Sequence, residues 1–455
     1  METTKEESQH LVEIIFLEIN QYKSENSTVH PYDISEQLLE LRDIDKDEYL
    51  RVLKKIPHDL FAEILSEMPE HIQEEITELL STKKIADIAS KMDTDDAATF
   101  IQILSEDNKE VAQSILETFN DEDKEIIEQL LAYDDNQAGS YMQTELFSAK
   151  IGDNIGDAIR RLKRLKEEGE LDNIWQAHIV DNNNKYLGSV GLEELIIFEH
   201  DLVFEDIPYE KYKNYFVHDK DNIKDVVEMV TNYNLTSVPV VNDHNVLVGR
   251  ITSDDIVDVI QESATEQIYN LAGVNDEAEQ EENMYEIGKS RALWLGLNLI
   301  TAIAASLVIG IFDSTIQSLV ALAVLMPIVA SMGGNAGTQT LTVTVRQMAL
   351  GDIDGEDAKK TIIKEVILSL ANGLIFAFAI GIIAYFWFKI PLLGVVIALS
   401  MVINLLSAGF FGSVIPLVLQ KAKIDPAIGS TVLLTTVTDV VGFFSFLGLA
   451  SIILL

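Results

Sequence analysis

Five long apolar segments fill the C-terminal part of this 455-residue chain, from about residue 291 onward. Each reaches or exceeds the roughly 20 residues that a helix needs to cross the hydrocarbon core of a bilayer. No signal peptide is expected, because the first ten residues are polar and the stretch after them is amphipathic. The segments predict five membrane-spanning helices, near residues 291–312, 317–345, 361–388, 392–419 and 427–454.

Charge divides the chain at nearly the same place. Of the 33 basic and 74 acidic residues, 9 basic and 8 acidic ones follow residue 286, so residues 1–286 hold 24 basic and 66 acidic residues. Such an acidic part argues against nucleic acid as a partner, because phosphate binding needs a basic surface. It favours cations as ligands. The absence of cysteine excludes disulfides, thiolate metal sites and a cysteine nucleophile.

The basic residues of the apolar part lie in alternate loops, which indicates the orientation in a bacterial inner membrane. One set of loops and flanks holds Lys289, Arg291, Arg346, Lys359, Lys360, Lys364, Lys421 and Lys423. The opposite loops hold only Lys389. We therefore expect the large N-terminal part in the cytoplasm. With an odd number of spans, the C-terminus is expected outside.

Asp439 lies in the middle of the last span, within the segment Thr435–Gly442. A carboxylate at that depth costs at least about 2.5–3.5 kcal/mol and usually marks a transport pathway. The alternative is a hydrogen bond to a neighbouring Thr or Asn, with Asp439 protonated. We favour the pathway, because the threonines of this segment already supply hydrogen bonds for helix packing.

A second signal is Pro327, followed by the glycine-rich segment Ser331–Gln339 in the second span. Proline and three glycines are expected to loosen a helix and expose its carbonyls, which a membrane tolerates only beside protein or water. The alternative is close helix packing through Gly333 and Gly337. Beside Asp439, pore lining is the better interpretation.

These residues suit Mg2+. A twofold dimer, the commonest symmetry, would bring two copies of Asp439 to one axis. Mg2+ prefers one or two carboxylates and retained waters. The absence of His and Cys from the spans makes the site poor for a transition metal. The candidate pore ligands are Asp439, Asn335, Gly334 and Thr338.

The acidic part shows two kinds of repetition. Recurring Leu/Ile spacing over residues 32–132 predicts short helices in an α-solenoid-like superhelix. Residues 138–262 hold a clear duplication, in which strand, polar turn, strand and acidic-capped helix recur at an offset of 61. This duplication resembles a tandem pair of CBS domains, modules that often bind adenine nucleotides. Asp181 and Thr252 are candidate ribose and phosphate contacts for ATP, and a purely structural pair remains the alternative.

With these parts in order, the chain resembles the MgtE family of magnesium channels over essentially its whole length. The specific matches are the segments from Pro327 to Gln339 and from Thr435 to Leu449; Asp134–Met142 and Glu262–Glu266 support them. The resemblance implies a multidomain membrane protein with an N-terminal helical superhelix, two α/β CBS domains, a connecting plug helix and five transmembrane helices in a homodimer. The expected parts are residues 1–31, an N-terminal extension; 32–132, the superhelix; 138–200 and 201–262, the CBS units; 263–288, the plug helix; and 289–455, the membrane domain.

The resemblance also implies a pore lined by spans two and five, and acidic residues that bind regulatory Mg2+. Repulsion between acidic faces would be offset by divalent ions, so high cytosolic Mg2+ would favour a compact, closed state. Gln267 departs from the family's plug pattern and removes one carboxylate. The implied regulatory residues are Asp95, Asp96, Asp221, Asp254, Asp255, Asp258, Glu262, Glu266 and Asp425.

Three alternatives remain open. The first is the same architecture carrying another divalent cation, such as Co2+ or Mn2+, or exchanging it for another ion. The second is a non-transporting magnesium sensor. The third is a nucleotide-regulated membrane enzyme, although the sequence contains no P-loop, HExxH or G-x-S-x-G motif. We therefore expect no enzymatic activity. Mg2+ uptake is expected because the membrane potential draws cations inward.

Overall fold

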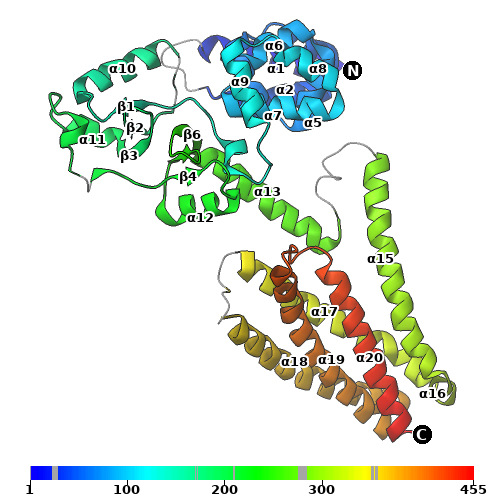
Figure 1. The fold of residues 1–455 in the computed structure, drawn as a ribbon. Helices are drawn as coiled ribbons and strands as arrows, with labels where there is room; N and C mark the ends of the chain where they lie inside the picture. Colours follow the sequence, from blue (N-terminus) through cyan, green and yellow to red (C-terminus); the bar gives the residue numbers. More distant parts are fainter. Residues whose placement is uncertain are drawn as a thin grey trace. The chain divides into compact units, whose positions relative to one another are not determined.

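The structure is a computed structural model of the protein. It divides into two compact units, Met1–Gln261 and Glu262–Leu455. Figure 1 follows the chain through both units. The structure describes residues 2–22, 29–169, 171, 173–208, 211–274, 284–349, 353 and 357–455.

Nine described helices, α1 to α9, open the first unit. Helices two positions apart in the chain pack against one another, α2 on α4, α4 on α6 and α6 on α8, while α5, α7 and α9 form a second row. This stacking is the predicted superhelix. The helices are α1 (Glu2–Tyr22), α2 (Pro31–Ile44), α3 (Lys46–Leu53), α4 (His58–Ser66), α5 (Glu70–Leu79), α6 (Thr82–Ala89), α7 (Thr94–Asp107), α8 (Lys109–Leu116) and α9 (Asp121–Leu130).

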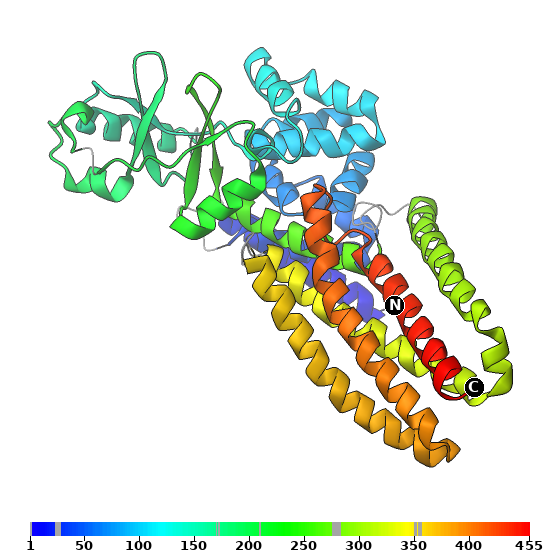
Figure 2. The same ribbon diagram turned by 60° about the horizontal axis from the view of Figure 1, so that its bottom comes forward.

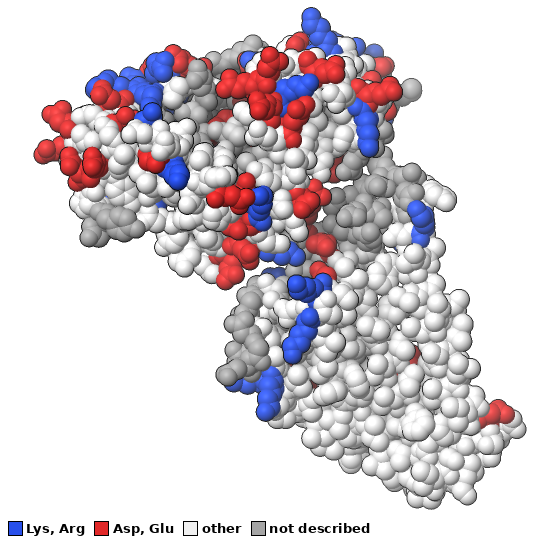
Figure 3. All heavy atoms as spheres, in the orientation of Figure 1, with Lys and Arg blue, Asp and Glu red and all other residues white. Residues whose placement is uncertain are grey.

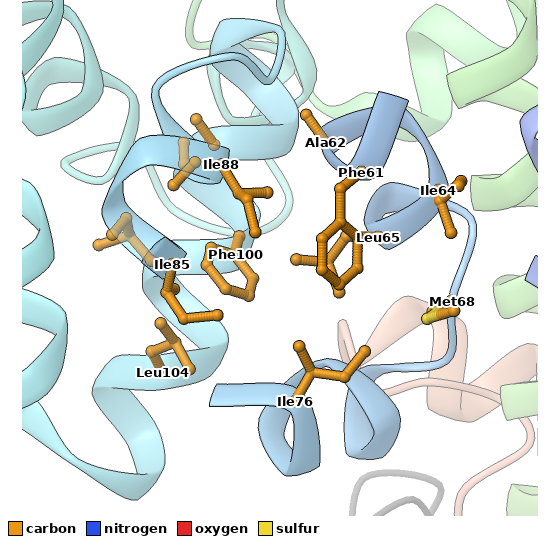
Figure 4. Packing of buried hydrophobic residues seen from close by; sticks show 14 of the residues in the cluster. Phe61, Ala62, Ile64, Leu65, Met68, Ile76, Ile85, Ile88, Phe100 and Leu104 are labelled. Atoms are coloured by element: carbon orange, nitrogen blue, oxygen red, sulfur yellow. The ribbon is translucent and has the colours of Figure 1, made fainter. Parts of the chain in front are cut away.

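The short helices bury one apolar face each, so their recurring Leu and Ile spacing becomes a continuous core. Phe61 and Leu65 from α4, Ile76 from α5, Ile88 from α6 and Phe100 from α7 approach one another in this core (Figure 4). The same core continues into the second CBS unit. The superhelix and that unit therefore share one hydrophobic core.

Two three-stranded sheets follow, each with one parallel and one antiparallel pair, in the orders β1-β2-β3 and β4-β5-β6. The sheets are the two halves of the predicted duplication. Short 3-10 helices η1 (Ala138–Tyr141) and η2 (Phe204–Asp206) lie ahead of each half. The elements are β1 (Ser148–Lys150), α10 (Ile155–Glu167), β2 (Gln176–Val180), β3 (Tyr186–Gly191), α11 (Leu192–Ile197), β4 (Val217–His218), α12 (Ile223–Tyr233), β5 (Ser237–Val241), β6 (Leu247–Thr252) and α13 (Ser253–Ala272).

Backbone details repeat at the offset of 61. Asn184 and Asn245, in the two hairpin turns, both have a positive φ, of 59° and 58°. Asn173 and Asn234, before the second strand of each sheet, have φ values of 48° and 50°. Asn tolerates this left-handed region better than most residues, so the same turn chemistry builds both halves.

The connecting segment differs from its prediction. The sequence predicts a plug helix over residues 263–288, but α13 begins in the second CBS unit and ends at Ala272. Gly273 has a φ of 72°, and the amide of Val274 donates to the carbonyl of Tyr269 at 2.9 Å, as at many helix ends closed by a left-handed glycine. Residues 275–283 of the predicted plug lie outside the described residues, and the next helix begins at Met284.

Five described helices of the second unit are long and apolar enough to cross a membrane, which confirms the predicted number. The face shown in Figure 3 is almost free of charge over these helices, and basic side chains gather at one of their ends. A short helix, α16 (Asp313–Ser318), separates the first two spans, so the second span starts four residues later than expected. The long helices are α15 (Met284–Ile311), α17 (Ala321–Ala349), α18 (Asp357–Phe388), α19 (Pro391–Lys421) and α20 (Ser430–Ile453).

Helix α19 is the centre of this bundle. It packs against α17, α18 and α20, whereas α15 packs mainly along α20. Figures 1 and 2 both show α15 at the side of the bundle next to α20, and α18 on the other side. Helices α17 and α20, which carry the two membrane motifs, also pack directly on one another.

Candidate ion pathway and regulatory carboxylates

Asp439 lies in α20 and is half-buried in the single chain. Its carboxylate accepts no hydrogen bond from any side chain or amide that the structure describes. The neighbouring threonines do not supply one, because Thr435 and Thr436 donate to the carbonyls of Thr431 and Val432, at 2.9 and 2.7 Å. The hydrogen-bonded alternative considered from the sequence is therefore not observed within one chain.

Helix α17 carries an exposed polar stripe. Ser331, Asn335 and Thr338 are all exposed and recur at helical spacing. Gly334, beside Asn335, has open space around its Cα, since a methyl group there would meet no atom within 4 Å. Three of the predicted pore ligands, Asn335, Gly334 and Thr338, thus lie on or next to one accessible face of α17.

Helix α17 is continuous through the Pro327 and glycine segment, contrary to the expectation of a loosened helix. Close packing explains the glycines. A Cβ at Gly333 would lie 2.2 Å from the Nδ2 atom of Asn404 in α19, and one at Gly337 would lie 3.0 Å from Leu434 in α20. The small-residue alternative is therefore correct for Gly333 and Gly337, whereas Gly334 remains open.

Sequence reasoning missed two buried polar residues of the membrane helices. Asn404 is 0% exposed, and its Nδ2 atom donates to the carbonyl of Val329 in α17 at 2.8 Å. Glu365 in α18 is 4% exposed and accepts a hydrogen bond from Thr340 of α17 at 3.2 Å. Both polar groups are recognisable from their positions inside apolar spans, but the sequence does not show what they face.

Glu365 lines a cavity of about 340 Å³ between α17, α18 and α19. The cavity lies on the side of α17 that faces α18, so Glu365 contacts a helix of the candidate pathway without belonging to its exposed stripe. The polar lining residues are Gln339, Thr340, Lys364, Glu365, Ser369 and Asn372.

In the first unit, the start of α7 contacts the segment around Gln143, which lies ahead of β1 and pairs with the second sheet. Asp95 is 8% exposed, and the side-chain Nε2 atom of Gln143 lies 3.4 Å from the Oδ2 atom of Asp95. Thr94 donates to Glu145 at 2.9 Å. The amide and carbonyl of Gln143 exchange hydrogen bonds with those of Arg250 in β6, at 2.9 Å each. The segment around Gln143 thus links α7 to the second sheet.

Carboxylates crowd this junction. Burial, followed by the charges of Asp96, Asp255 and Asp93, raises the pKa of Asp95 well above its usual range. Burial also raises the pKa of Asp255 to about 6, although the hydroxyl and amide of Thr252 donate to its carboxylate. Desolvation by the surrounding protein atoms raises the pKa of the Asp96 carboxyl to about 6, although the residue is exposed to solvent on one side. Each charge therefore makes the next ionisation harder.

Two more predicted regulatory residues lie on α13 near Asp255. Asp254 and Asp258 are exposed, and burial together with the charge of Asp254 raises the pKa of Asp258. Asp221 stabilises its local turn, because its carboxylate accepts a hydrogen bond from the backbone amide of His218 at 2.7 Å. The structure thus brings Asp95, Asp96 and Asp255 into one electrostatic cluster with Asp254.

The remaining predicted regulatory residues belong to the second unit. Glu262 and Glu266 lie on α13 beyond the CBS unit, and Asp425 lies in the loop before α20. Asp425 accepts from the amide of Ala427 at 2.7 Å, so one of its oxygens orders that loop. Across the described residues, no group of three or more Asp, Glu, His or Cys side chains is arranged closely enough to hold a metal ion.

The candidate nucleotide residues both have local partners. Asp181 accepts from the amides of Asn183 and Lys185, at 2.7 and 2.9 Å, and so stabilises the hairpin turn. Thr252, directly before α13, donates through its amide and hydroxyl to the carboxylate of Asp255 in the first turn of that helix. These contacts agree with the structural alternative for the pair and do not test nucleotide binding.

The last turn of α13 packs on the membrane helices. Leu271 contacts a cluster that includes Leu341 of α17 and Leu434 of α20. Thr431, in the first turn of α20, donates to the carbonyl of Leu271 at 2.8 Å. One helix therefore starts with the acidic residues of the second CBS unit and ends against both candidate pore helices.

Family models match three parts of the chain: a divalent cation transporter over residues 326–449, an MgtE intracellular N domain over 29–136 and a CBS domain over 206–262. A magnesium transporter MgtE of Enterococcus faecalis is 32% identical over 325 residues, which cover 71% of each chain. The crystal structure of the soluble part of a magnesium transporter has a TM-score of 0.50 and 24% identity, and covers 57% of this chain and 99% of that one.

A further solved structure is the cytosolic domain of the Mg2+ channel MgtE in complex with ATP, with a TM-score of 0.46, 24% identity and coverage of 51% of this chain and 91% of that one. The membrane helices and the matched models define a membrane transporter of divalent cations. The chain belongs to the MgtE family of magnesium transporters.

Proposed function

We propose that this protein is a homodimeric Mg2+ channel of the bacterial inner membrane, and that Mg2+ bound by its cytoplasmic carboxylates closes it. The observation that carries the proposal is Asp439, a half-buried carboxylate inside a membrane helix that accepts no hydrogen bond from the described residues. Because such a group is costly in a bilayer, it needs either a cation or water. A passing hydrated Mg2+ supplies both.

The exposed polar stripe of α17 supports a dimer. Ser331, Asn335 and Thr338 belong to a span yet face outward from the single chain. Asn335 donates to Ser331 at 3.4 Å, but hydrocarbon would leave other polar atoms of the stripe unsatisfied. A second copy that presents the same stripe would enclose a polar pathway. It would also supply a second Asp439, so that two carboxylates balance one divalent ion.

The crowded carboxylates at the start of α7 and α13 support regulation. Their mutual charges disfavour full ionisation, and a divalent cation would relieve that repulsion. Asp95 and Asp96 come from the superhelix and Asp254 and Asp255 from the second CBS unit, so binding would favour contact between these parts. Carboxylate oxygens are the donors that Mg2+ prefers.

Helix α13 connects this cluster to the membrane part. Its first turn holds Asp254 and Asp255, and its last turn accepts a hydrogen bond from Thr431 of α20. A change in the position of α13 would act directly on α20, the helix that carries Asp439. High cytosolic Mg2+ would then hold the closed arrangement, and low Mg2+ would release it. Glu262, Glu266 and Asp425 would add carboxylates near that helix and its contact.

The basic residues at one end of the spans support a cytoplasmic N-terminus and an external C-terminus. With that orientation the membrane potential drives cations towards the large acidic unit. The transporter would therefore mediate Mg2+ uptake, and its closure by internal Mg2+ would be negative feedback. ATP at the CBS pair remains a candidate modulator, with Asp181 and Thr252 as its contacts.

Mg2+ flux into liposomes tests the transport step. Asp439→Asn removes the charge without changing the size of the side chain, and we expect flux to fall to the background of empty liposomes. The matched control is Asp313→Asn. Asp313 is an exposed residue of α16 that accepts a hydrogen bond from the side-chain amide of Gln317 at 2.7 Å. Wild-type flux from Asp439→Asn would show that the pathway lies elsewhere. Competition with Co2+ and Mn2+ in the same assay tests the broader divalent alternative.

A further inference from the structure

A buried arginine lies inside the acidic junction between the superhelix and the second CBS unit. Arg250 in β6 is 3% exposed. Its guanidinium donates to the side-chain oxygen of Gln143 at 2.6 Å and to the carbonyl of Asn173 at 2.8 Å. Burying a guanidinium is costly unless hydrogen bonds and negative charges compensate.

The compensating charges come from both sides of the junction. Asp93, Glu145, Asp95 and Asp254 act on Arg250 and favour its charged form, against the effect of burial, which lowers its pKa. Asp93 and Asp95 belong to the superhelix and Asp254 to the CBS unit. The guanidinium is therefore a fixed positive charge, since arginine stays protonated in proteins.

The duplicated sequence shows that the fold itself does not require this arginine. Ser189 occupies the equivalent position in the first CBS unit, 61 residues earlier. Both residues sit in the third strand of their sheet in the same register, Ser189 opposite His178 and Arg250 opposite Pro239. Ser189 is also buried and forms a neutral hydrogen bond of 2.8 Å with His178. The same strand of the repeated unit therefore forms with a serine at this position in the first copy and with an arginine in the second.

We propose that Arg250 is the built-in counter-cation of the regulatory carboxylates, and that it holds the superhelix on the second CBS unit when no divalent ion is bound. The inference rests on the regulation proposed above and adds a residue that sets how far this contact depends on Mg2+. Loss of the charge leaves Asp93, Asp95 and Asp254 in mutual repulsion, which bound divalent ions would then offset.

Hydrogen exchange of the full-length protein in lipid nanodiscs tests this role. The amides of α7 report the opening of the junction, and they are compared in EDTA and in saturating Mg2+. We expect Arg250→Met, which keeps length but loses charge, to lower α7 protection about tenfold in EDTA, the equivalent of one lost charge contact. Saturating Mg2+ should restore protection to the wild-type level. Arg250→Lys, which retains the charge, should keep most of the protection in EDTA.

A second variant separates charge compensation from packing. Asp93→Asn removes the carboxylate that acts most strongly on Arg250. If the arginine compensates charge, Asp93→Asn alone lowers α7 protection in EDTA, because the attraction to Arg250 is lost. In the Arg250→Met background the same change instead recovers most of the lost protection, because it removes an uncompensated carboxylate. A packing role predicts equal loss in EDTA and Mg2+, with no recovery. Amides of β2 and β3 in the first CBS unit check that each variant is folded.

The outcomes distinguish the inference from the regulation beneath it. Wild-type protection that responds to Mg2+, with Arg250→Met unchanged in EDTA, overturns the inference and leaves the regulation standing. A different outcome is that α7 protection in the wild type does not respond to Mg2+, that Arg250→Met still lowers this protection, and that adding Asp93→Asn restores it. The counter-cation role of Arg250 then stands, and Mg2+ regulation at this junction fails. Should Arg250→Met not fold, an unchanged α7 protection in Asp93→Asn overturns the inference.

Discussion

Replacing Asp255 with asparagine should stabilise the acidic N-terminal unit, Met1–Gln261, in the absence of divalent ions. Asp255 has a pKa of about 6 in the folded protein, against a usual value of 3.8. Each unit of difference corresponds to about 1.36 kcal/mol, so keeping Asp255 ionised at pH 7 costs the folded state about 3 kcal/mol. Asparagine carries no charge, and it retains an oxygen that can accept from Thr252.

The sign of the pH dependence follows from the raised pKa. Below about pH 3 Asp255 is protonated in both states and costs nothing. Between about pH 4 and pH 6 the wild type loses stability, because the carboxyl ionises in the unfolded chain before it ionises in the folded one. Asp255→Asn should lose less over this range. The difference between the two proteins should therefore be about 3 kcal/mol at pH 7 and approach zero near pH 3.

Scanning calorimetry of the full-length protein in detergent micelles with EDTA measures the effect. A gain of about 3 kcal/mol corresponds to a rise in Tm of roughly 6–12 °C for a unit of this size. The matched control is Asp243→Asn in the same CBS unit, where an exposed ion pair with Lys220 lowers the pKa, so no stabilisation is expected. A Tm at pH 7 equal to or below that of the wild type would refute the reasoning.

Two further variants, each with a matched control, test packing and coupling. Gly333→Ala should destabilise the membrane bundle by about 1–3 kcal/mol in detergent unfolding, because its Cβ overlaps a buried amide, while Gly334→Ala should be neutral. Equal effects would contradict the packing described. Thr431→Val removes the 2.8 Å hydrogen bond to Leu271 and should raise residual flux at high Mg2+ about fivefold, the equivalent of roughly 1 kcal/mol. Thr436→Val, which loses only a bond within α20, is its control, and equal flux from the two would rule out this coupling.

The five spans and the two CBS units could be predicted because their signals are local. Apolar length alone defines a span, and the two sheets recur at a fixed offset, down to the left-handed Asn184 and Asn245. Gly273 shows the limit of this reasoning. Because acidic, helix-forming residues lie on both sides of Gly273, the sequence favours one continuous helix through this position. The glycine itself could have indicated the helix end that the structure shows there.

The candidate site could be predicted only in part. Asp439 stands out because a single carboxylate interrupts an apolar span. Asn404, Glu365 and Arg250 owe their importance to what packs around them. Asn404 fits against a glycine of α17, whereas the partners of Glu365 and Arg250 lie 25 and 107 residues away in the sequence. Such long-range contacts leave no periodic pattern in the sequence.

The most direct test of the central claim is Mg2+ flux through the wild-type protein in oriented proteoliposomes, with Mg2+ varied only on the side that holds the acidic N-terminal unit. Asp439→Asn gives the baseline for leakage. The account predicts clear flux at low Mg2+ on that side and a fall towards this baseline at high Mg2+. Flux that stays the same at both concentrations would contradict gating by the acidic unit.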